Sequence, residues 1–540
     1  MYNVIFYDKV KEVVETEIVI HRNYNEDGTY TDIETTQEVT KKYRVPTKFV
    51  FDTATNCDKL LQNFTVLDDF EADMPSINSA ISMFENSSIV SLKGTNGGAS
   101  DFTTLNSGDY MFKNCKSLTS ININASALTT VKGFVNNCSS LISFSGSLES
   151  LIDGSDMFNS ISTLTSFDAS LNSLENGTSM FAFTSLPIFS IELPALETAS
   201  EMFINSKLTS FDKQLPNLTV ANSMFENCSE LSFVNINCPL LENGDRMFNN
   251  TTIESIILDA PRLNSAVDMF SGIIEDGATI NNLISFSGNL NSLIVGDNMF
   301  CDSALTTFDV PNLDNLESAE NMMGQPQFES WNIEMPSLIS GYNMFTSKYI
   351  GLEEYEWISF DVMAEQEGLT QITEDGEVKW TDGEGFELTN EEKLDYFKSR
   401  DEIYEVNEEN NLVRYISKEL KLYPALLSFE SDLSSLTNGN SMFKECVNLK
   451  HFNAPLPSLV DGFDMFTKCK LDAESAMYIA ESLPYYSEEE AQFITLGLNT
   501  SESDVDSFFT STGLYSSFDD YKSRLFDKGW NLIPVYNPEN

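Results

Sequence analysis

The 540-residue chain is poor in basic residues, with 31 Lys and Arg against 83 Asp and Glu, and its formal net charge is -52. Because phosphate backbones repel so acidic a surface, nucleic acid is not expected as a direct partner. Such a charge suits solubility, cation binding or attraction of a basic partner.

Long apolar runs are also missing. The N-terminus lacks a basic segment followed by an apolar stretch, and no later window is apolar for 18 residues. The sequence therefore predicts neither a secretion signal nor a membrane span. Eight widely spread cysteines predict no disulfide framework, which indicates a reducing compartment or assembly before the protein leaves a cell.

Residues for catalysis are scarce. The glycines of SLKGTNGGAS (91–100) lack the Lys-Ser/Thr and the strand-to-helix context of a phosphate loop. The only two histidines, His21 and His451, have no partner that the sequence places near them, which argues against Ser-His or Cys-His catalysis. Paired carboxylates need no special explanation in this chain, although a glycosidase on a β-solenoid stays open as an alternative. We predict no catalytic, cofactor-binding or metal-ligating residues, and no cofactor.

The chain contains many copies of one sequence motif, a Met-Phe pair followed by Asn and by Leu-x-x-Phe. Most copies follow each other at 22 or 23 residues. Two steps, Phe84 to Phe112 and Phe270 to Phe300, are longer and predict loop insertions. The second residue of the pair, the anchor, falls at Leu61, Phe84, Phe112, Val135, Phe158, Phe181, Phe203, Phe225, Phe248, Phe270, Phe300, Met323, Phe345, Phe443 and Phe466.

The apolar positions around each anchor fit neither a sustained helix nor a strictly alternating strand. One coil has them at Leu208, Phe211, Leu215, Leu218, Ala221, Met224 and Phe225. A period of this length is typical of a solenoid, because one unit cannot bury its apolar face until neighbours stack on it. We predict about 15 coils, with Leu-x-x-Phe as the strand of each coil and a parallel sheet along one side.

Two other positions recur. Asn follows the anchor by two residues, and we expect its amide to bond backbone groups of its own and the adjacent coil. Cys follows by three and is interpreted as a small buried residue, with a Cys115–Cys138 disulfide as the alternative. The asparagines are Asn63, Asn86, Asn114, Asn137, Asn205, Asn227 and Asn250, and the cysteines are Cys115, Cys138, Cys228, Cys446 and Cys469.

The segments MFENCSELSFV and MFKNCKSLTSI resemble the BspA-like (Treponema-type) leucine-rich repeat over residues 56–352 and 426–470. The resemblance implies a mainly β leucine-rich-repeat solenoid. Many such proteins are bacterial surface adhesins with signal peptides, and similar repeats occur in virion proteins of phages that infect gut Bacteroidetes. Because no export signal is visible here, the resemblance favours the virion.

The first 55 residues hold two strand-like runs that predict a long β-hairpin turning at Asp27-Gly28. The same stretch nearly matches a calcium loop, with candidate ligands at Asn23, Asn25, Asp27 and Glu34, but the strand-like flanks favour a plain turn. The hairpin would cap the first coil or dock the protein onto an assembly.

Two further segments depart from the repeat. Residues 353–425 predict an inserted acidic α+β module with a helix over 389–406 that starts at Thr389 and Asn390. Trp357 and Trp380 are either core residues of this module or anchors for a partner. Residues 471–540 predict an α/β cap in which Asp472 begins a helix, followed by strands at FITLGLN and WNLIPVY and a helix near 504–526.

Three functions follow. The leading hypothesis is a non-enzymatic structural or adhesive virion component, tail- or capsid-associated, that binds other virion proteins or a host receptor or glycan. A homo-oligomer in a symmetric assembly fits this role. The first alternative is a bacterial cell-surface adhesin of BspA type. The second is a carbohydrate-active enzyme.

Overall fold

Two compact units make up the chain in this computed structural model, residues 1–346 with 424–540, and Ser347–Tyr423. The structure describes all residues except 1–3, 7–8, 25–29, 46, 51–53, 276–277, 346–347, 354–356, 360–362, 364–369, 375–376, 382–396, 399–403, 408–411, 416–417, 488–489 and 537–540.

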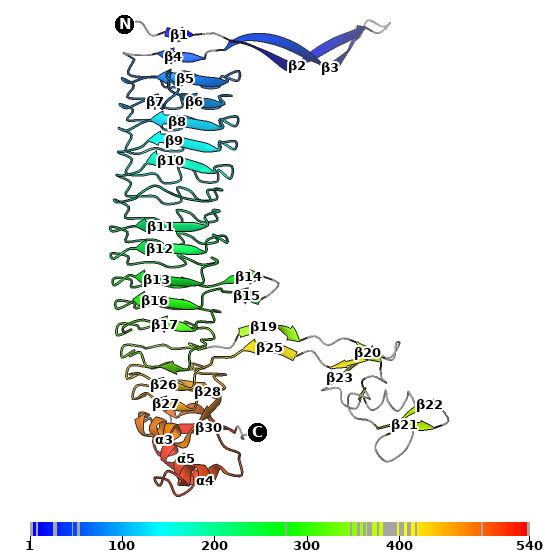
Figure 1. Cartoon of the computed structure of the whole chain (residues 1–540), viewed down its shortest axis with the longest axis vertical. Helices are drawn as coiled ribbons and strands as arrows, with labels where there is room; N and C mark the ends of the chain where they lie inside the picture. The colour runs from blue at the N-terminus through cyan, green and yellow to red at the C-terminus, as the bar shows by residue number, and fades with distance from the viewer. Residues whose placement is uncertain are drawn as a thin grey trace. The chain divides into compact units, whose positions relative to one another are not determined.

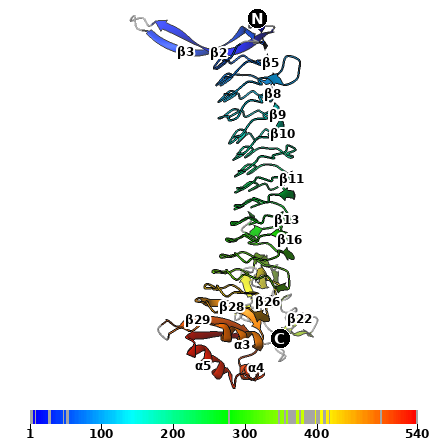
Figure 2. The same ribbon diagram turned by 90° about the vertical axis from the view of Figure 1, so that its left-hand side faces the viewer.

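The first unit is a stack of coils, most of which have a short strand on the same side (Figure 1; Figure 2 shows the coils from another side). These strands pair in parallel within four consecutive sheets, so the predicted solenoid fold is confirmed. The strands are β4 (Lys48–Val50), β5 (Asp69–Asp73), β6 (Ser91–Lys93), β7 (Ser100–Asp101), β8 (Ser120–Asn124), β9 (Ser143–Ser147) and β10 (Ser166–Ser170); β11 (Ser210–Gln214) and β12 (Phe233–Asn237); β13 (Ser255–Asp259), β16 (Ser285–Asn289) and β17 (Thr307–Asp309); β18 (Ser330–Trp331), β26 (Ser428–Glu430) and β27 (His451–Asn453).

The strand lies slightly later in the coil than predicted. In the coil of Phe225, β11 begins at Ser210 and extends beyond Phe211, while Leu208 precedes the strand. Alternation explains the shift, because Phe211 points inward and its two neighbours point outward. A second ladder of single-residue parallel bridges runs along another side of the coils from Thr130 to Asp461.

The anchors form the centre of the core. Phe203, Phe225 and Phe248 are buried and stack ring on ring, with centroids 5.7 Å and 5.6 Å apart. The strand phenylalanine Phe211 meets Phe225 edge to face at 4.9 Å. The coil of Phe225 thus adds two rings to an aromatic core that is built by stacking, which explains why a single coil could not fold alone.

The recurrent asparagine has a different role from the one predicted. Asn114 donates from Nδ2 to Oδ1 of Asn86 at 2.8 Å and accepts from Asn137 at 2.8 Å, so the amides bond each other and not the backbone. Its φ is +60°, and Asn86 and Asn137 share this left-handed conformation. Asn recurs because it is among the few non-glycine residues that readily adopt this conformation, and stacking then aligns the amides.

The cysteines are all free thiols, and seven of the eight are buried. Sγ of Cys115 donates to the carbonyl of Phe84, and Sγ of Cys138 to that of Phe112, at 2.9 and 3.0 Å. The same bond joins Cys228 to Phe203 at 3.0 Å. The interpretation as small buried residues is therefore confirmed, and the alternative Cys115–Cys138 disulfide is wrong because each thiol is bonded to the preceding coil instead.

The N-terminal hairpin is confirmed as β2 (Lys9–Tyr24) paired with β3 (Tyr30–Val45) from Lys9↔Val45 to Tyr24↔Tyr30. The predicted turn at Asp27-Gly28 lies outside the described residues, as do the candidate calcium ligands Asn25 and Asp27. Before the hairpin, β1 (Val4–Phe6) pairs antiparallel with β4. The strand that closes the first edge of the parallel sheet is thus β1, so the hairpin does not cap the coils by strand pairing.

The two enlarged coils carry different insertions. In the first, Asp73 accepts bonds from the backbone N–H groups of Thr95 and Asp101, at 3.0 Å each, and from the Thr95 hydroxyl. Burial raises the pKa of this carboxyl, but these bonds outweigh burial and leave the pKa lowered. A carboxylate therefore occupies the donors of the glycine-rich loop, which disfavours phosphate there. In the second, β14 (Ile273–Glu275) and β15 (Ala278–Ile280) form an antiparallel hairpin.

The C-terminal part covers the last coil. It contains β28 (Gly462–Leu471), α3 (Ala473–Ser482), β29 (Gln492–Leu498), α4 (Val505–Thr510), α5 (Phe518–Asp527) and β30 (Trp530–Tyr536). Asp472 caps α3 as predicted, since its Oδ1 accepts from the Ser475 N–H at 2.8 Å. Where one helix was expected near 504–526 the structure has two, because the chain turns at Gly513 with a φ of +74°.

The second unit consists of short antiparallel pairs. They are β19 (Lys348–Glu353) with β25 (Lys418–Leu422); β20 (Ile358–Ser359) and β23 (Tyr404–Asn407) with β24 (Leu412–Tyr415); and β21 (Thr370–Glu374) with β22 (Glu377–Thr381). The helix expected over 389–406 is wrong at its C-terminal end, because β23 pairs there with β24. Its predicted start at Thr389 and Asn390 lies outside the described residues.

Candidate binding surface

The outward face of the parallel sheet exposes apolar side chains near the middle of the stack. In most coils the residue before the inward residue of the strand is a serine, but two coils have the large apolar residues Ile188 and Phe233 there. These side chains are 64% and 55% exposed. Parallel pairing places both next to Ser210, whose small side chain separates them.

A third apolar residue extends this surface. Ile257 lies two positions beyond the same column in β13 and is 72% exposed. Exposed carboxylates of Asp212 and Asp259 belong to the same face of the sheet. We call Ile188, Phe233 and Ile257 the sheet-face patch. A rigid apolar surface with an acidic surround fits a partner with apolar anchors and basic groups.

The serine that recurs before the inward residue of most strands is the sequence signal that could have revealed this patch. Serine precedes the inward residue in β8, β9, β10 and β11, so an isoleucine or phenylalanine there departs from the repeat. Sequence reasoning missed it because it followed the inward positions, which are conserved in character from coil to coil, and not the outward ones.

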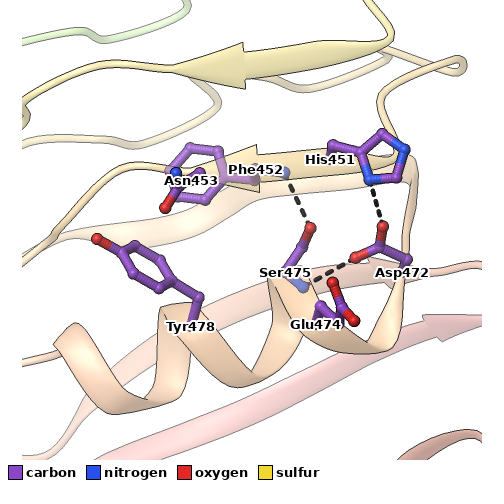
Figure 3. Close-up of a pocket in the computed structure, with 7 residues that line it drawn as sticks. All are labelled: His451, Phe452, Asn453, Asp472, Glu474, Ser475 and Tyr478. Carbon is purple, nitrogen blue, oxygen red and sulfur yellow. Dashed lines mark hydrogen bonds and ion pairs between the residues drawn. The ribbon is translucent and has the colours of Figure 1, made fainter. Parts of the chain in front are cut away.

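A hollow at the last coil is lined by His451, Phe452, Asn453, Asp472, Glu474, Ser475 and Tyr478 (Figure 3). Nδ1 of His451 lies 2.5 Å from Oδ2 of Asp472, so the expectation that His451 has no partner is wrong. Sequence spacing held the signal, because the two residues are one coil apart.

This hollow brings a histidine, a carboxylate and a serine together, but the serine hydroxyl is not bonded to the histidine as it would be in a catalytic triad. Asp472 reaches Ser475 through the serine backbone N–H, and His451 is on the far side of Asp472 (Figure 3). The buried Ser475 hydroxyl donates to the Lys450 carbonyl at 3.1 Å and accepts from the Phe452 N–H at 2.9 Å. A nucleophile needs its proton facing a base, so these bonds join the cap to the last coil instead.

The remaining candidates were also placed. Trp357 is partly exposed, with the Arg414 guanidinium 4.7 Å from its ring centroid. The side chains of His21 and Trp380 lie outside the described residues. Among the residues that the structure describes there is no group of three or more His, Cys, Asp or Glu that could hold a metal ion. In that same part of the chain no helix is long and apolar enough to cross a membrane.

A family model described as "BspA type Leucine rich repeat region (6 copies)" matches residues 81–209 and 197–322. No curated protein matches the chain. One similar solved structure is a leucine-rich repeat protein from Bacteroides ovatus ATCC 8483, with 12% identity, 95% of this chain and 98% of that chain covered, and a TM-score of 0.18. Another is a leucine rich cell surface protein from Faecalibacterium prausnitzii A2-165, with 13% identity, coverage of 61% and 90%, and a TM-score of 0.16.

Proposed function

Because the chain is a BspA-type leucine-rich repeat protein, we propose that it is a non-enzymatic protein-binding solenoid that acts at a bacterial cell surface. The observation that carries the binding role is the sheet-face patch. Ile188, Phe233 and Ile257 expose apolar side chains from a rigid sheet, at positions that do not contribute to the core. A few large apolar side chains on such a surface supply much of the affinity in protein complexes.

The acidic side chains around the sheet-face patch indicate which kind of partner it binds. With a net charge of -52 and acidic side chains such as Asp212 on the same face, the surface attracts basic proteins over a distance and repels acidic ones. A protein with apolar anchors between Lys or Arg side chains complements it.

The non-enzymatic part of the proposal is supported by the hydrogen bonds of the hollow in Figure 3. Its serine hydroxyl is committed to two backbone groups, and its histidine and carboxylate are paired with each other. The carbohydrate-active enzyme stays a prediction, which release of reducing sugar from glycans would test.

The cell-surface location follows the BspA-like adhesins that the repeat resembles. The virion role, which the sequence favoured through the lack of a visible export signal, has no comparison behind it and stays a prediction. Protease treatment of intact producing cells separates the two. Cleavage of the chain on intact cells supports the surface location, whereas its recovery in fixed stoichiometry from purified phage particles would replace it with the virion.

Binding is tested on the purified chain with surface proteins extracted from the cells it contacts. Phe233→Ser with Ile257→Ser removes the apolar side chains of the sheet-face patch without changing its charge and should abolish retention of basic proteins. Ile294→Ser is the matched control, since Ile294 is 39% exposed and is not in the patch. Equal retention by both variants would contradict the assignment of the patch.

A further inference from the structure

The β2–β3 hairpin has one uncovered apolar face. Side chains alternate between the two faces of a strand, so Val10, Val14 and Ile18 share one face. They are 62%, 60% and 66% exposed. The register of the hairpin places Val10 opposite Arg44 and Ile18 opposite Thr36 on that face. We call this the Val10–Ile18 face.

On the opposite face the described polar side chains bond one another. The Tyr43 hydroxyl donates to Glu15 at 2.5 Å, and Nζ of Lys41 lies 2.9 Å from Glu15 and 2.8 Å from Glu17. Val13 on this face is half-buried. The hairpin therefore has one satisfied face and one face that still exposes its apolar groups.

A two-stranded ribbon of this kind needs a cover. An isolated hairpin is marginally stable in water at best, and stability requires a further layer against its apolar face. Because β2 and β3 are 16 residues each, an uncovered ribbon leaves a long apolar stripe in water.

The charges on the Val10–Ile18 face indicate what covers it. At the base of the hairpin Lys42 is opposite Glu12, with Nζ and Oε1 2.8 Å apart. Four residues closer to the tip, Glu38 is opposite Thr16 and has no basic side chain across from it. Lys42 and Arg44 thus outnumber Glu12 on one side of Val14, whereas Glu38 lies on the other side.

We propose that a second copy of this chain covers this face, with the two hairpins packed face to face and their strands antiparallel about a two-fold axis at Val14. This arrangement places Val10 over Ile18 of the second copy and Ile18 over Val10 of the second copy. It also brings Lys42 opposite Glu38 of the second copy, twice by symmetry, because a two-fold interface uses the same patch on both chains. The inference is independent of the sheet-face patch and of the partner proposed for it.

Charge exchange in the full-length chain tests the proposal. Sedimentation velocity from low micromolar to near-millimolar concentration should show a dimer for the unmodified chain. Lys42→Glu or Glu38→Lys alone places like charges opposite each other at two symmetric sites, and we expect either to weaken dimerisation by about tenfold or more. The double variant restores the opposite charges and should dimerise again.

Mixing gives the sharpest result. A Lys42→Glu chain and a Glu38→Lys chain should each be largely monomeric alone but form a one-to-one heterodimer together, because both cross pairs are then of opposite sign. Ile18→Lys should abolish the dimer, whereas Ile142→Lys, at a 50% exposed site outside both the hairpin and the sheet-face patch, should leave it unchanged. Far-UV circular dichroism and thermal unfolding confirm that each variant is folded.

A monomer at every concentration would overturn the proposal. A dimer that Ile18→Lys does not affect, or single charge variants that the double variant and the mixture fail to rescue, would overturn it equally. In the latter case the two copies meet elsewhere.

Discussion

Asn438 donates from Nδ2 to the Ser340 hydroxyl at 3.2 Å, and the two residues form one step of the parallel bridge ladder although they are 98 positions apart. On either side, Trp331 pairs with Phe429 and the rings of Phe345 and Phe443 stack at 5.4 Å. The coil before Ser347–Tyr423 and the coil after it are therefore direct neighbours in the stack.

This continuity predicts that residues 347–423 are dispensable for the solenoid. Replacing them by two glycines returns the Phe345–Phe443 step to about 23 residues, the period of the array. We expect the shortened chain to keep the far-UV circular dichroism of the coils and a thermal midpoint close to that of the full chain. Loss of cooperative unfolding would show that the second unit supports the stack.

The anchors should carry much of the stability. Phe225→Ala removes a buried ring that meets Phe203, Phe211 and Phe248, and we expect a loss of about 3–5 kcal/mol by cavity formation in urea unfolding. Phe233→Ala, at a 55% exposed site, should change stability by no more than about 0.5 kcal/mol. Similar effects of the two substitutions would mean that the inward and outward positions are misassigned.

The stacked asparagines that follow the anchors should tolerate glycine better than alanine, because their φ is positive. Asn114→Ala forces alanine into a φ of +60° and removes both amide bonds. Asn114→Gly also removes the bonds but tolerates the conformation, so we expect the alanine variant to be less stable than the glycine variant by about 1–2 kcal/mol. Denaturant midpoints measured side by side decide the order, and an alanine variant at least as stable as the glycine variant would refute this account.

The buried thiols should make the solenoid sensitive to alkali. Burial raises the pKa of Cys228 from 9.0 to about 11 and that of Cys238 to about 12. A pKa that is higher in the folded state stabilises the fold fully below the unfolded value, and this stability is lost as pH rises toward the folded value. Urea stability should therefore fall between about pH 9 and pH 11.

Cys228→Ser is the matched control for this prediction. Serine retains a donor for the Phe203 carbonyl and does not titrate in this range. Its alkaline loss of stability should be smaller than that of the unmodified chain. If the two pH profiles coincide, the loss arises from other groups such as the tyrosines.

The period itself predicted most of the solenoid, because inward positions must repeat wherever coils stack. It predicted the burial of Phe225 and Cys228, since both are covered by the adjacent coils. The cap at Asp472 was predicted by a helix-start pattern within one helical turn. The period misplaced the strand start at Ser210 and the role of Asn114, because both depend on backbone conformation that residue type alone leaves open.

The candidate surfaces were less predictable. Ile188 and Phe233 are well separated in sequence, and only parallel stacking brings them to either side of Ser210. His451 and Asp472 meet because the C-terminal cap folds back onto the last coil. Only the hairpin register shows that Lys42 and Glu38 lie on the Val10–Ile18 face, on opposite sides of Val14.

By itself the sequence determined that this chain is a stack of coils with an aromatic core, because a repeated apolar pattern can be buried only by repeated neighbours. The tertiary structure decided which of the remaining side chains face water together. That depends on strand register and on the return of distant segments, which bring side chains within contact distance at separations that local sequence does not encode.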